Sequence, residues 1–90
     1  MRPNRSTLAG ALEVEEAGRT TVLVVDDEPR FHENIARYLE GYRVLAAYNG
    51  VQARRMLGRH HVDVVLLDLD LPDTTGLALL REWRAERDDL

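Results

Sequence analysis

Aspartates follow the two most apolar segments of the chain. Asp26 and Asp27 come directly after the run 21–25, and Asp68 comes directly after the run 62–67. If these runs are neighbouring parallel strands, their carboxyl ends meet at one edge of a sheet, which is where open parallel sheets bind ligands. Three carboxylates brought together there repel one another, and one of them takes up a proton unless a cation lies between them.

Such a group of side chains has the ligands that a hard divalent cation prefers. Carboxylate, carbonyl and water oxygens suit Mg²⁺ and also Mn²⁺, and bound magnesium commonly keeps positions open for phosphate oxygens. The ion would orient a phosphoryl donor and offset the charge that develops during transfer to a carboxylate nucleophile. A simpler interpretation, in which each aspartate only starts a loop or caps a helix, stays open for each residue alone. A pair at one strand end and a single aspartate at another favour the metal site.

The hydrophobic pattern predicts three strands that alternate with three helices. Continuous apolar runs indicate strands that are covered on both faces, as in a parallel sheet. Pro29 is tolerated in a first helical turn, Gly41 is a plausible end for that helix, and Asn49 can cap the next one. Parallel pairing is expected, with right-handed crossovers. The strands are predicted at 21–25, 42–47 and 62–67, and the last helix begins near Gly76.

The remaining side chains are expected either to pack or to be solvated. His32 is predicted on the exposed face of the first helix, and His60 with His61 in a solvated connection away from the aspartates. The side chains of Asp70 and Asp73 are predicted to be solvated in a loop. The apolar helix positions are expected to be Phe31, Ile35, Tyr38 and Leu39, then Ala53, Met56 and Leu57, and finally Leu77, Leu80 and Trp83.

The composition excludes several classes of protein. The 90 residues carry a formal net charge of −4 and contain no cysteine, so there is neither a disulfide framework nor a thiolate metal site. Mild acidity and the lack of a long apolar run indicate a cytoplasmic protein with no direct nucleic-acid or membrane partner. Residues 1–19 mix proline, glycine, serine and charge, so we expect a flexible N-terminal extension before a single domain at 20–90.

Three stretches of the chain resemble the receiver domain of two-component response regulators. The segment 22–29 (VLVVDDEP) resembles the first strand and acidic pair of that family, and the segment 42–53 resembles its second strand and the start of its second helix. The segment 64–72 (VVLLDLDLP), with Gly76 after it, resembles the family's phosphorylation segment. The resemblance covers about residues 20–88. It implies an α/β, flavodoxin-like parallel sheet with central strand order 2-1-3.

The resemblance also implies a role for each acidic residue. Asp68 would be the phosphoacceptor and would receive a phosphoryl group from a phosphohistidine on a sensor histidine kinase or a histidine phosphotransfer protein. Asp27 and Asp68 would bind Mg²⁺ through their side chains. Asp26 would act mainly through a metal-bound water, and Asp70 would contribute its backbone carbonyl. The chain would then be a phosphoacceptor signalling domain and not an enzyme.

The chain departs from the family pattern in three places. The connection between the first helix and the second strand is short, because Leu39 and Glu40 run almost directly into Gly41 and Tyr42. Thr75 stands where an aspartate or asparagine commonly precedes the glycine, although threonine can still cap a helix. Leu90 is reached where the fourth strand is expected to begin, so the family's Ser or Thr on strand four and its Lys on strand five have no matching positions. We therefore expect a partial receiver domain at 20–90, truncated before strands 4 and 5. Its third strand would be an open edge through which chains can self-associate.

Two other functions remain open. The chain would be a truncated pseudo-receiver, acting only through protein–protein contacts, if the missing lysine abolishes the response to phosphorylation. It would instead be a haloacid-dehalogenase-like phosphatase if Asp68 and Asp70 are that family's nucleophile and acid/base, which also lie two residues apart at a strand end. Against the phosphatase, Leu71 and Pro72 stand where glycine and threonine should follow, and the acidic pair after the first strand has no role.

Overall fold

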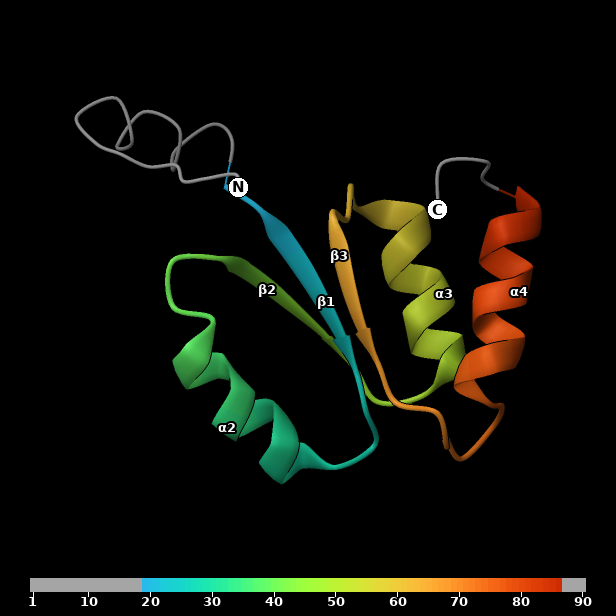
Figure 1. The fold of residues 1–90 in the computed structure, drawn as a ribbon, viewed down its shortest axis with the longest axis horizontal. Helices are drawn as coiled ribbons and strands as arrows, with labels where there is room; N and C mark the ends of the chain where they lie inside the picture. Colours follow the sequence, from blue (N-terminus) through green and yellow to red (C-terminus); the bar gives the residue numbers. More distant parts are fainter. Residues whose placement is uncertain (1–18, 87–90) are drawn as a thin grey trace.

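The computed structural model describes residues 19–86, which form three strands and three helices. The predicted alternation of strands and helices is confirmed. The expected extension at 1–19 lies, apart from Arg19, outside the described residues. No helix within 19–86 has the length and apolar character needed to cross a bilayer. In chain order the elements are β1 (Thr21–Val25), α2 (Pro29–Tyr38), β2 (Arg43–Ala47), α3 (Gly50–Arg59), β3 (Val64–Leu67) and α4 (Gly76–Glu86) (Figure 1).

The strands form one parallel sheet in the order β2-β1-β3. This confirms the predicted order 2-1-3 of a flavodoxin-like sheet. The central strand β1 is in register with both neighbours, so that Val25 lies opposite Ala47 of β2 and opposite Leu67 of β3. Because the carboxyl ends of β1 and β3 are level, the residues that follow these two strands emerge side by side.

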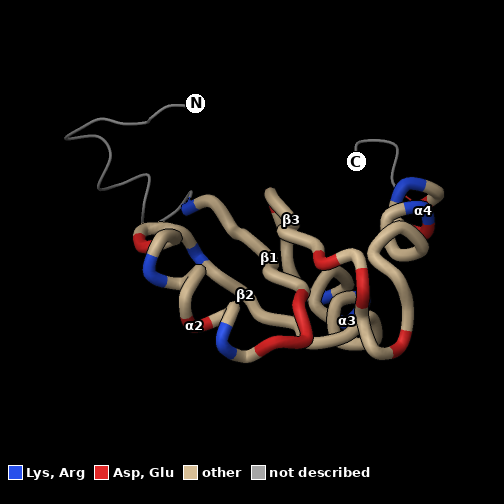
Figure 2. The backbone as a smooth tube through the Cα atoms, turned by 60° about the horizontal axis from the view of Figure 1, so that its bottom comes forward, with Lys and Arg blue, Asp and Glu red and all other residues tan. Residues whose placement is uncertain are grey.

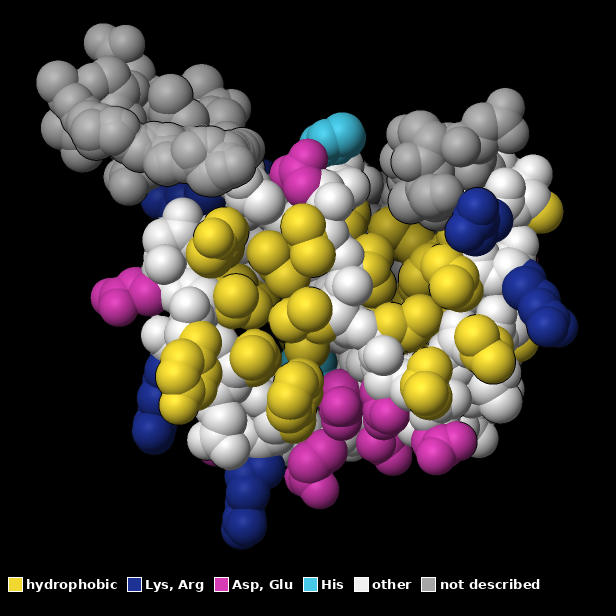
Figure 3. All heavy atoms as spheres, viewed as in Figure 1, with side chains coloured by type: hydrophobic (Ala, Val, Ile, Leu, Met, Phe, Trp, Pro, Cys, Tyr) yellow, Lys and Arg dark blue, Asp and Glu magenta, His cyan; other side chains and the backbone are white. Residues whose placement is uncertain are grey.

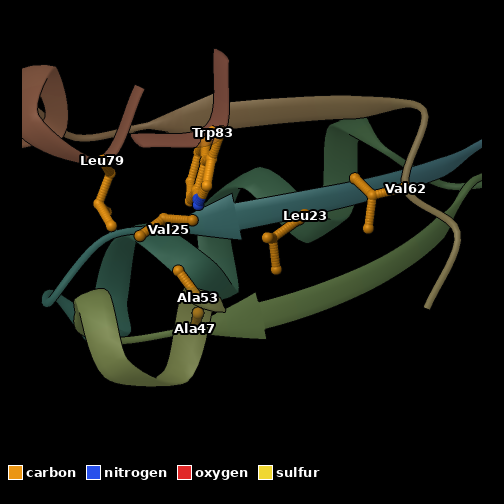
Figure 4. Packing of buried hydrophobic residues seen from close by; sticks show 7 residues of the cluster. All are labelled: Leu23, Val25, Ala47, Ala53, Val62, Leu79 and Trp83. Carbon is orange, nitrogen blue, oxygen red and sulfur yellow. The ribbon is translucent and has the colours of Figure 1, made fainter. Parts of the chain in front are cut away.

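The main core lies between the sheet and the layer formed by α3 and α4. Leu23 and Val25 of β1 lie in one buried cluster with Ala53 of α3 and with Leu79 and Trp83 of α4 (Figure 4). Burial of each large apolar side chain stabilises the fold by roughly 1.5–3 kcal/mol. The intervening residues of β1 point to the other face of the sheet. The crossover from β1 to β2 and the crossover from β2 to β3 run in opposite directions along the sheet. Because both are expected to be right-handed, they place α2 and α3 on opposite faces. Figure 1 shows α2 apart from α3 and α4.

The apolar face predicted for the first helix is only partly correct. Ile35 and Leu39 are half-buried as expected, but Phe31 is 38% exposed and Tyr38 is 80% exposed. The prediction that His32 is exposed is wrong, because this residue is buried. The buried stripe of α2 therefore runs through positions 32, 35 and 39. A histidine can occupy it because its ring nitrogen has a hydrogen-bond partner in the fold.

The buried face of α4 also differs from the predicted one. Trp83 is buried as predicted, but its companion is Leu79, whereas Leu77 is 56% exposed and Leu80 is 39% exposed. Gly76 sets this rotation of the helix, because a side chain there would overlap the backbone at the end of β3. Residues three and seven positions further along lie on the same helix face as the glycine. The close approach at Gly76 thus directs Leu79 and Trp83 toward the sheet.

The predicted helix ends are confirmed by local hydrogen bonds and backbone geometry. The Asn49 side chain accepts a hydrogen bond from the Gln52 amide at 2.8 Å and so caps α3. Pro29 occupies the first turn of α2. After that helix, Gly41 has a φ of 94°, a conformation that residues with a side chain rarely adopt. These short-range signals mark the start of α2, the turn after it and the start of α3.

Candidate functional site

Three carboxylates come together where β1 and β3 end. Asp26, Asp27 and Asp68, here called the acidic cluster, each offer a carboxylate oxygen, and these atoms all lie within 4.8 Å of one another. Asp26 and Asp68 are partly buried and Asp27 is exposed. Figure 2 shows acidic segments on one side of the molecule near the ends of these strands, and Figure 3 shows acidic side chains gathered below the sheet. The structure thus brings together three of the four residues predicted to bind a metal.

Asp26 is held by three hydrogen bonds. Its amide donates to the carbonyl of Ala47 at 3.0 Å, which continues the pairing of β1 with β2 by one residue. Its Oδ1 accepts a hydrogen bond from the Glu28 amide at 2.9 Å. Its own carbonyl oxygen lies 2.7 Å from Nε2 of His32 in α2. Backbone and side chain of Asp26 are therefore both fixed before any ligand binds.

Asp68 is positioned by the pairing of β3 with β1. Its amide donates to the carbonyl of Val25 at 2.9 Å, which places Asp68 beside the residue that follows β1. One of its carboxylate oxygens accepts a hydrogen bond from the Asp70 amide at 3.3 Å. On the other side, α4 begins so close that a Cβ at Gly76 would overlap the carbonyl oxygen of Asp68. Asp68, the candidate nucleophile, therefore lies at the end of a strand and not in a long loop.

The fourth predicted ligand, Asp70, lies in the turn between β3 and α4. Its side chain is exposed and is not part of the acidic cluster. Asp70 forms an isolated antiparallel bridge with Thr75, which closes the turn. The hydroxyl of Thr75 accepts a hydrogen bond from the Ala78 amide at 3.1 Å, which confirms that threonine can cap this helix. The role predicted for Asp70 concerns its backbone carbonyl and stays a prediction.

Asp73 makes a contact that the sequence did not predict. Its two carboxylate oxygens accept hydrogen bonds from the amides of Gly50 at 2.7 Å and Val51 at 3.0 Å, the first two residues of α3. The amide hydrogen bond from Gly50 is the main reason why the pKa of Asp73 lies below its ordinary value, and the Val51 amide and the charge of Arg54 act in the same direction. The side chain is exposed in a loop as expected, but it also makes these specific hydrogen bonds. It ties the β3–α4 turn to α3.

A second polar contact joins α3 to α4. The guanidinium of Arg54 lies 2.7 Å from Oε2 of Glu82 through Nε and 3.1 Å from Oε1 through Nη2. This side-chain hydrogen bond raises the pKa of Arg54 and lowers the pKa of Glu82. Both side chains are about 40% exposed, at 42% and 38%, so solvent screening keeps the contribution to stability small. The pair orients the two helices without touching the acidic cluster.

The other two histidines lie away from the acidic cluster. His60 and His61 precede β3, at the end of the sheet opposite to Asp68. The side chain of His61 is 81% exposed and lies 3.0 Å from the carboxylate of Asp63. The prediction of a solvated connection is confirmed for His61, and neither histidine is positioned to act at the acidic cluster.

The donor set of the acidic cluster fits a hard divalent cation. All three side chains are carboxylates, and between residues 19 and 86 the ion pairs formed are Arg54–Glu82 and His61–Asp63, so none of the three has a cationic partner there. Carboxylates this close repel one another, and a cation between them offsets that repulsion. Oxygen ligands suit Mg²⁺ and Mn²⁺. These residues can therefore hold such an ion.

Comparison with curated proteins relates the chain to transcriptional regulators. It is 39% identical over 71 residues to the transcriptional regulatory protein MalR of Bacillus subtilis, which covers 74% of this chain and 30% of MalR. It is 44% identical over 69 residues to the transcriptional regulatory protein KdpE of Mycobacterium tuberculosis, which covers 71% of this chain and 30% of KdpE. The chain thus spans less than a third of the length of these relatives.

Solved structures show the same fold. The response regulator TrrA of Thermotoga maritima, crystallised in complex with Mg²⁺-BeF, superposes with a TM-score of 0.73 at 36% identity, over 78% of this chain and 63% of TrrA. A CheY-like receiver domain protein of Methanospirillum hungatei gives a TM-score of 0.74 at 26% identity, over 79% of this chain and 58% of that protein. The family model of the response regulator receiver domain matches residues 22–90. The chain therefore belongs to the response regulator receiver domain family.

Proposed function

We propose that the chain is a phosphoacceptor module of a two-component phosphorelay, in which Asp68 takes a phosphoryl group from a phosphohistidine. A carboxylate oxygen of Asp68 forms the new bond to phosphorus while the bond between phosphorus and the histidine nitrogen breaks. The observation that carries this proposal is the meeting of Asp68 with Asp26 and Asp27 at level strand ends, with ligand atoms within 4.8 Å. The domain would act as a signalling domain in the cytoplasm and not as an enzyme.

Each acidic residue has a distinct part in this proposal. Asp27 and Asp68 hold Mg²⁺ through their carboxylates, Asp26 acts through a water bound to the ion, and Asp70 provides its backbone carbonyl. Mn²⁺ suits the same oxygen donors. When bound, the ion supplies positive charge that offsets the negative charge of the incoming phosphoryl oxygens. A related structure supports the choice of Mg²⁺, because TrrA was crystallised with Mg²⁺-BeF.

The proposed phosphoryl donor is a sensor histidine kinase or a histidine phosphotransfer protein. TrrA, which is 36% identical to this chain, has been crystallised in complex with the histidine kinase ThkA. The curated relatives are more than three times as long as the matched region, since that region covers 30% of MalR and of KdpE. The names of these relatives indicate transcriptional regulation, and an output of that kind is likewise a proposal for this chain.

Intact-mass spectrometry tests the proposal. The full chain is incubated with Mg²⁺ and a small phosphodonor such as acetyl phosphate, and we expect the mass to rise by one phosphoryl group. Asp68→Asn should abolish the gain, whereas Asp70→Asn should retain it because that variant keeps the backbone carbonyl. No gain in folded, Mg²⁺-saturated protein would favour the pseudo-receiver, and turnover of a phosphate ester that is lost in Asp70→Asn would favour the phosphatase.

We also propose that the chain self-associates through β3. In the sheet formed by residues 19–86, β3 is an edge strand, and Val64 is 44% exposed. Figure 3 shows further apolar side chains spread over the exposed face of the sheet. Unpaired apolar edges bind other strands, and a lysine on the edge prevents this. Sedimentation velocity at increasing concentration should show a dimer that Val64→Lys converts to monomer, and a wild-type monomer at every concentration contradicts the proposal.

A further inference from the structure

His32 is a buried polar residue behind the acidic cluster. It is 9% exposed, and within residues 19–86 only Thr21 is also both polar and buried. Its Nε2 lies 2.7 Å from the carbonyl oxygen of Asp26. A carbonyl oxygen can only accept a hydrogen bond, so Nε2 of His32 carries the proton and donates it. The contact joins α2 to the end of β1.

The imidazole ring of His32 packs against the ring of Tyr48, the residue that follows β2. The ring centroids of His32 and Tyr48 are 4.3 Å apart, with the two planes tilted by 41°. Tyr48 follows β2 directly, and its amide donates to the side chain of Gln52 at 2.8 Å. A ring that is buried and packed against a second ring has little freedom to turn away from its acceptor. His32 is therefore a rigid donor.

The hydrogen bond acts on Asp27 through the geometry of the peptide unit. The carbonyl of Asp26 and the amide of Asp27 belong to one planar group, so fixing the oxygen also fixes the plane from which Asp27 continues. The amide of Asp26 is held independently by Ala47 at 3.0 Å. The two peptide planes on either side of the Asp26 Cα are thus both fixed, one by β2 and the other by α2.

We propose that His32 is a positioning residue that keeps Asp26 and Asp27 in the geometry that binds a divalent cation. The inference rests on the cation site of the proposed function and deepens it. Groups that orient metal ligands through hydrogen bonds typically change metal affinity by about 10–100-fold when they are removed. The contact of His32 is of this kind, because it reaches the ligand residues through the backbone and leaves their carboxylates free.

A pair of substitutions separates the hydrogen bond from the packing. His32→Gln keeps an N–H donor at a similar reach, whereas His32→Met has a similar length and no donor. Mg²⁺ affinity is measured by isothermal titration calorimetry on the full chain, with the thermal midpoint of the metal-free protein recorded in parallel. We expect His32→Met to weaken Mg²⁺ binding by about 10-fold or more and His32→Gln to bind close to the wild type. Asp27→Asn, which removes a proposed ligand, should weaken Mg²⁺ binding whether or not His32 has the proposed role.

The outcomes distinguish this inference from the proposed function. If the wild type and Asp27→Asn bind Mg²⁺ equally poorly, the cation site itself is wrong, and the role of His32 falls with it. If Asp27→Asn weakens binding but His32→Met binds as the wild type does, only the role of His32 is overturned. Equal losses of thermal stability in both His32 variants, with unchanged affinity, likewise leave His32 as a merely structural residue.

A measurement on the wild type covers the case in which His32→Met does not fold. The Nε2 proton of His32 should be observable by NMR, because a buried hydrogen bond protects it from exchange. Its resonance should shift on addition of Mg²⁺ with the same midpoint as the amide of Asp27. A resonance that stays unchanged at saturating Mg²⁺, while the Asp27 amide moves, would overturn the inference.

Discussion

The carboxylate of Asp73 accepts a hydrogen bond from the amide of Gly50 at 2.7 Å, although 23 positions separate the two residues in the sequence. The turn that follows the proposed phosphoacceptor is therefore fastened to the first residue of α3. A carboxylate at a helix N-terminus also interacts favourably with the helix dipole. Movement of this turn requires that the contact be broken or that α3 move with it.

The first prediction concerns the pH dependence of this contact. The pKa of Asp73 is below its ordinary value in the folded chain, mainly because of the Gly50 amide. The stabilising effect of the ionised Asp73 carboxylate is therefore fully present above the unfolded pKa of about 3.9. It is lost as the pH falls through the pKa of Asp73 in the folded chain. Asp73→Asn should lower the urea midpoint at pH 7, and the difference from the wild type should shrink below about pH 4. A difference that is independent of pH would contradict the charge-based account.

The second prediction compares two glycine substitutions. A Cβ at Gly76 would overlap the carbonyl oxygen of Asp68 and lie 3.0 Å from the Cα of Leu69, whereas a Cβ at Gly58 would meet nothing within 4 Å. Gly76→Ala should lower the free energy of unfolding by about 1–3 kcal/mol, as overpacking of a close contact does. Gly58→Ala lies inside α3 and should raise it by about 0.5–1 kcal/mol. Urea unfolding measures both, and equal effects would refute the close approach at Gly76.

The third prediction tests the face of α4 that the structure buries. Leu79 is fully buried and Leu77 is 56% exposed, two residues apart in the same helix. Leu79→Ala should therefore destabilise the domain by about 2–5 kcal/mol through lost burial and the cavity left behind. Leu77→Ala should change the stability by less than about 0.5 kcal/mol. If Leu77→Ala proved the more damaging of the two, the rotation of α4 described above would be wrong.

The strands and the convergence of the aspartates could be predicted from the sequence because the signals are local. The apolar run 21–25 ends directly at Asp26, and the run that precedes Asp68 does the same, so parallel pairing brings their ends together. The order of the three strands followed from the resemblance to receiver domains. Caps such as Asn49 lie within three residues of the amide they bind.

The parts that the sequence could not predict depend on distant segments. The role of Asp73 depends on α3 lying beside the β3–α4 turn, and the burial of His32 depends on a carbonyl six residues earlier and on a tyrosine beyond β2. Neither contact leaves a periodic pattern. The faces of α2 and α4 were predicted from apolar spacing alone, yet a close backbone approach at Gly76 and a hydrogen bond at His32 set the actual rotation.

Locating the phosphoryl group tests the central claim most directly. Borohydride reduces an aspartyl phosphate to homoserine, and peptide mass spectrometry then identifies the residue that carried it. After incubation with Mg²⁺ and acetyl phosphate, we predict homoserine at position 68 and at no other carboxylate, and none when EDTA removes the metal. Homoserine at Asp26, Asp27 or Asp70 instead, or at no position in folded and Mg²⁺-saturated protein, would contradict the account.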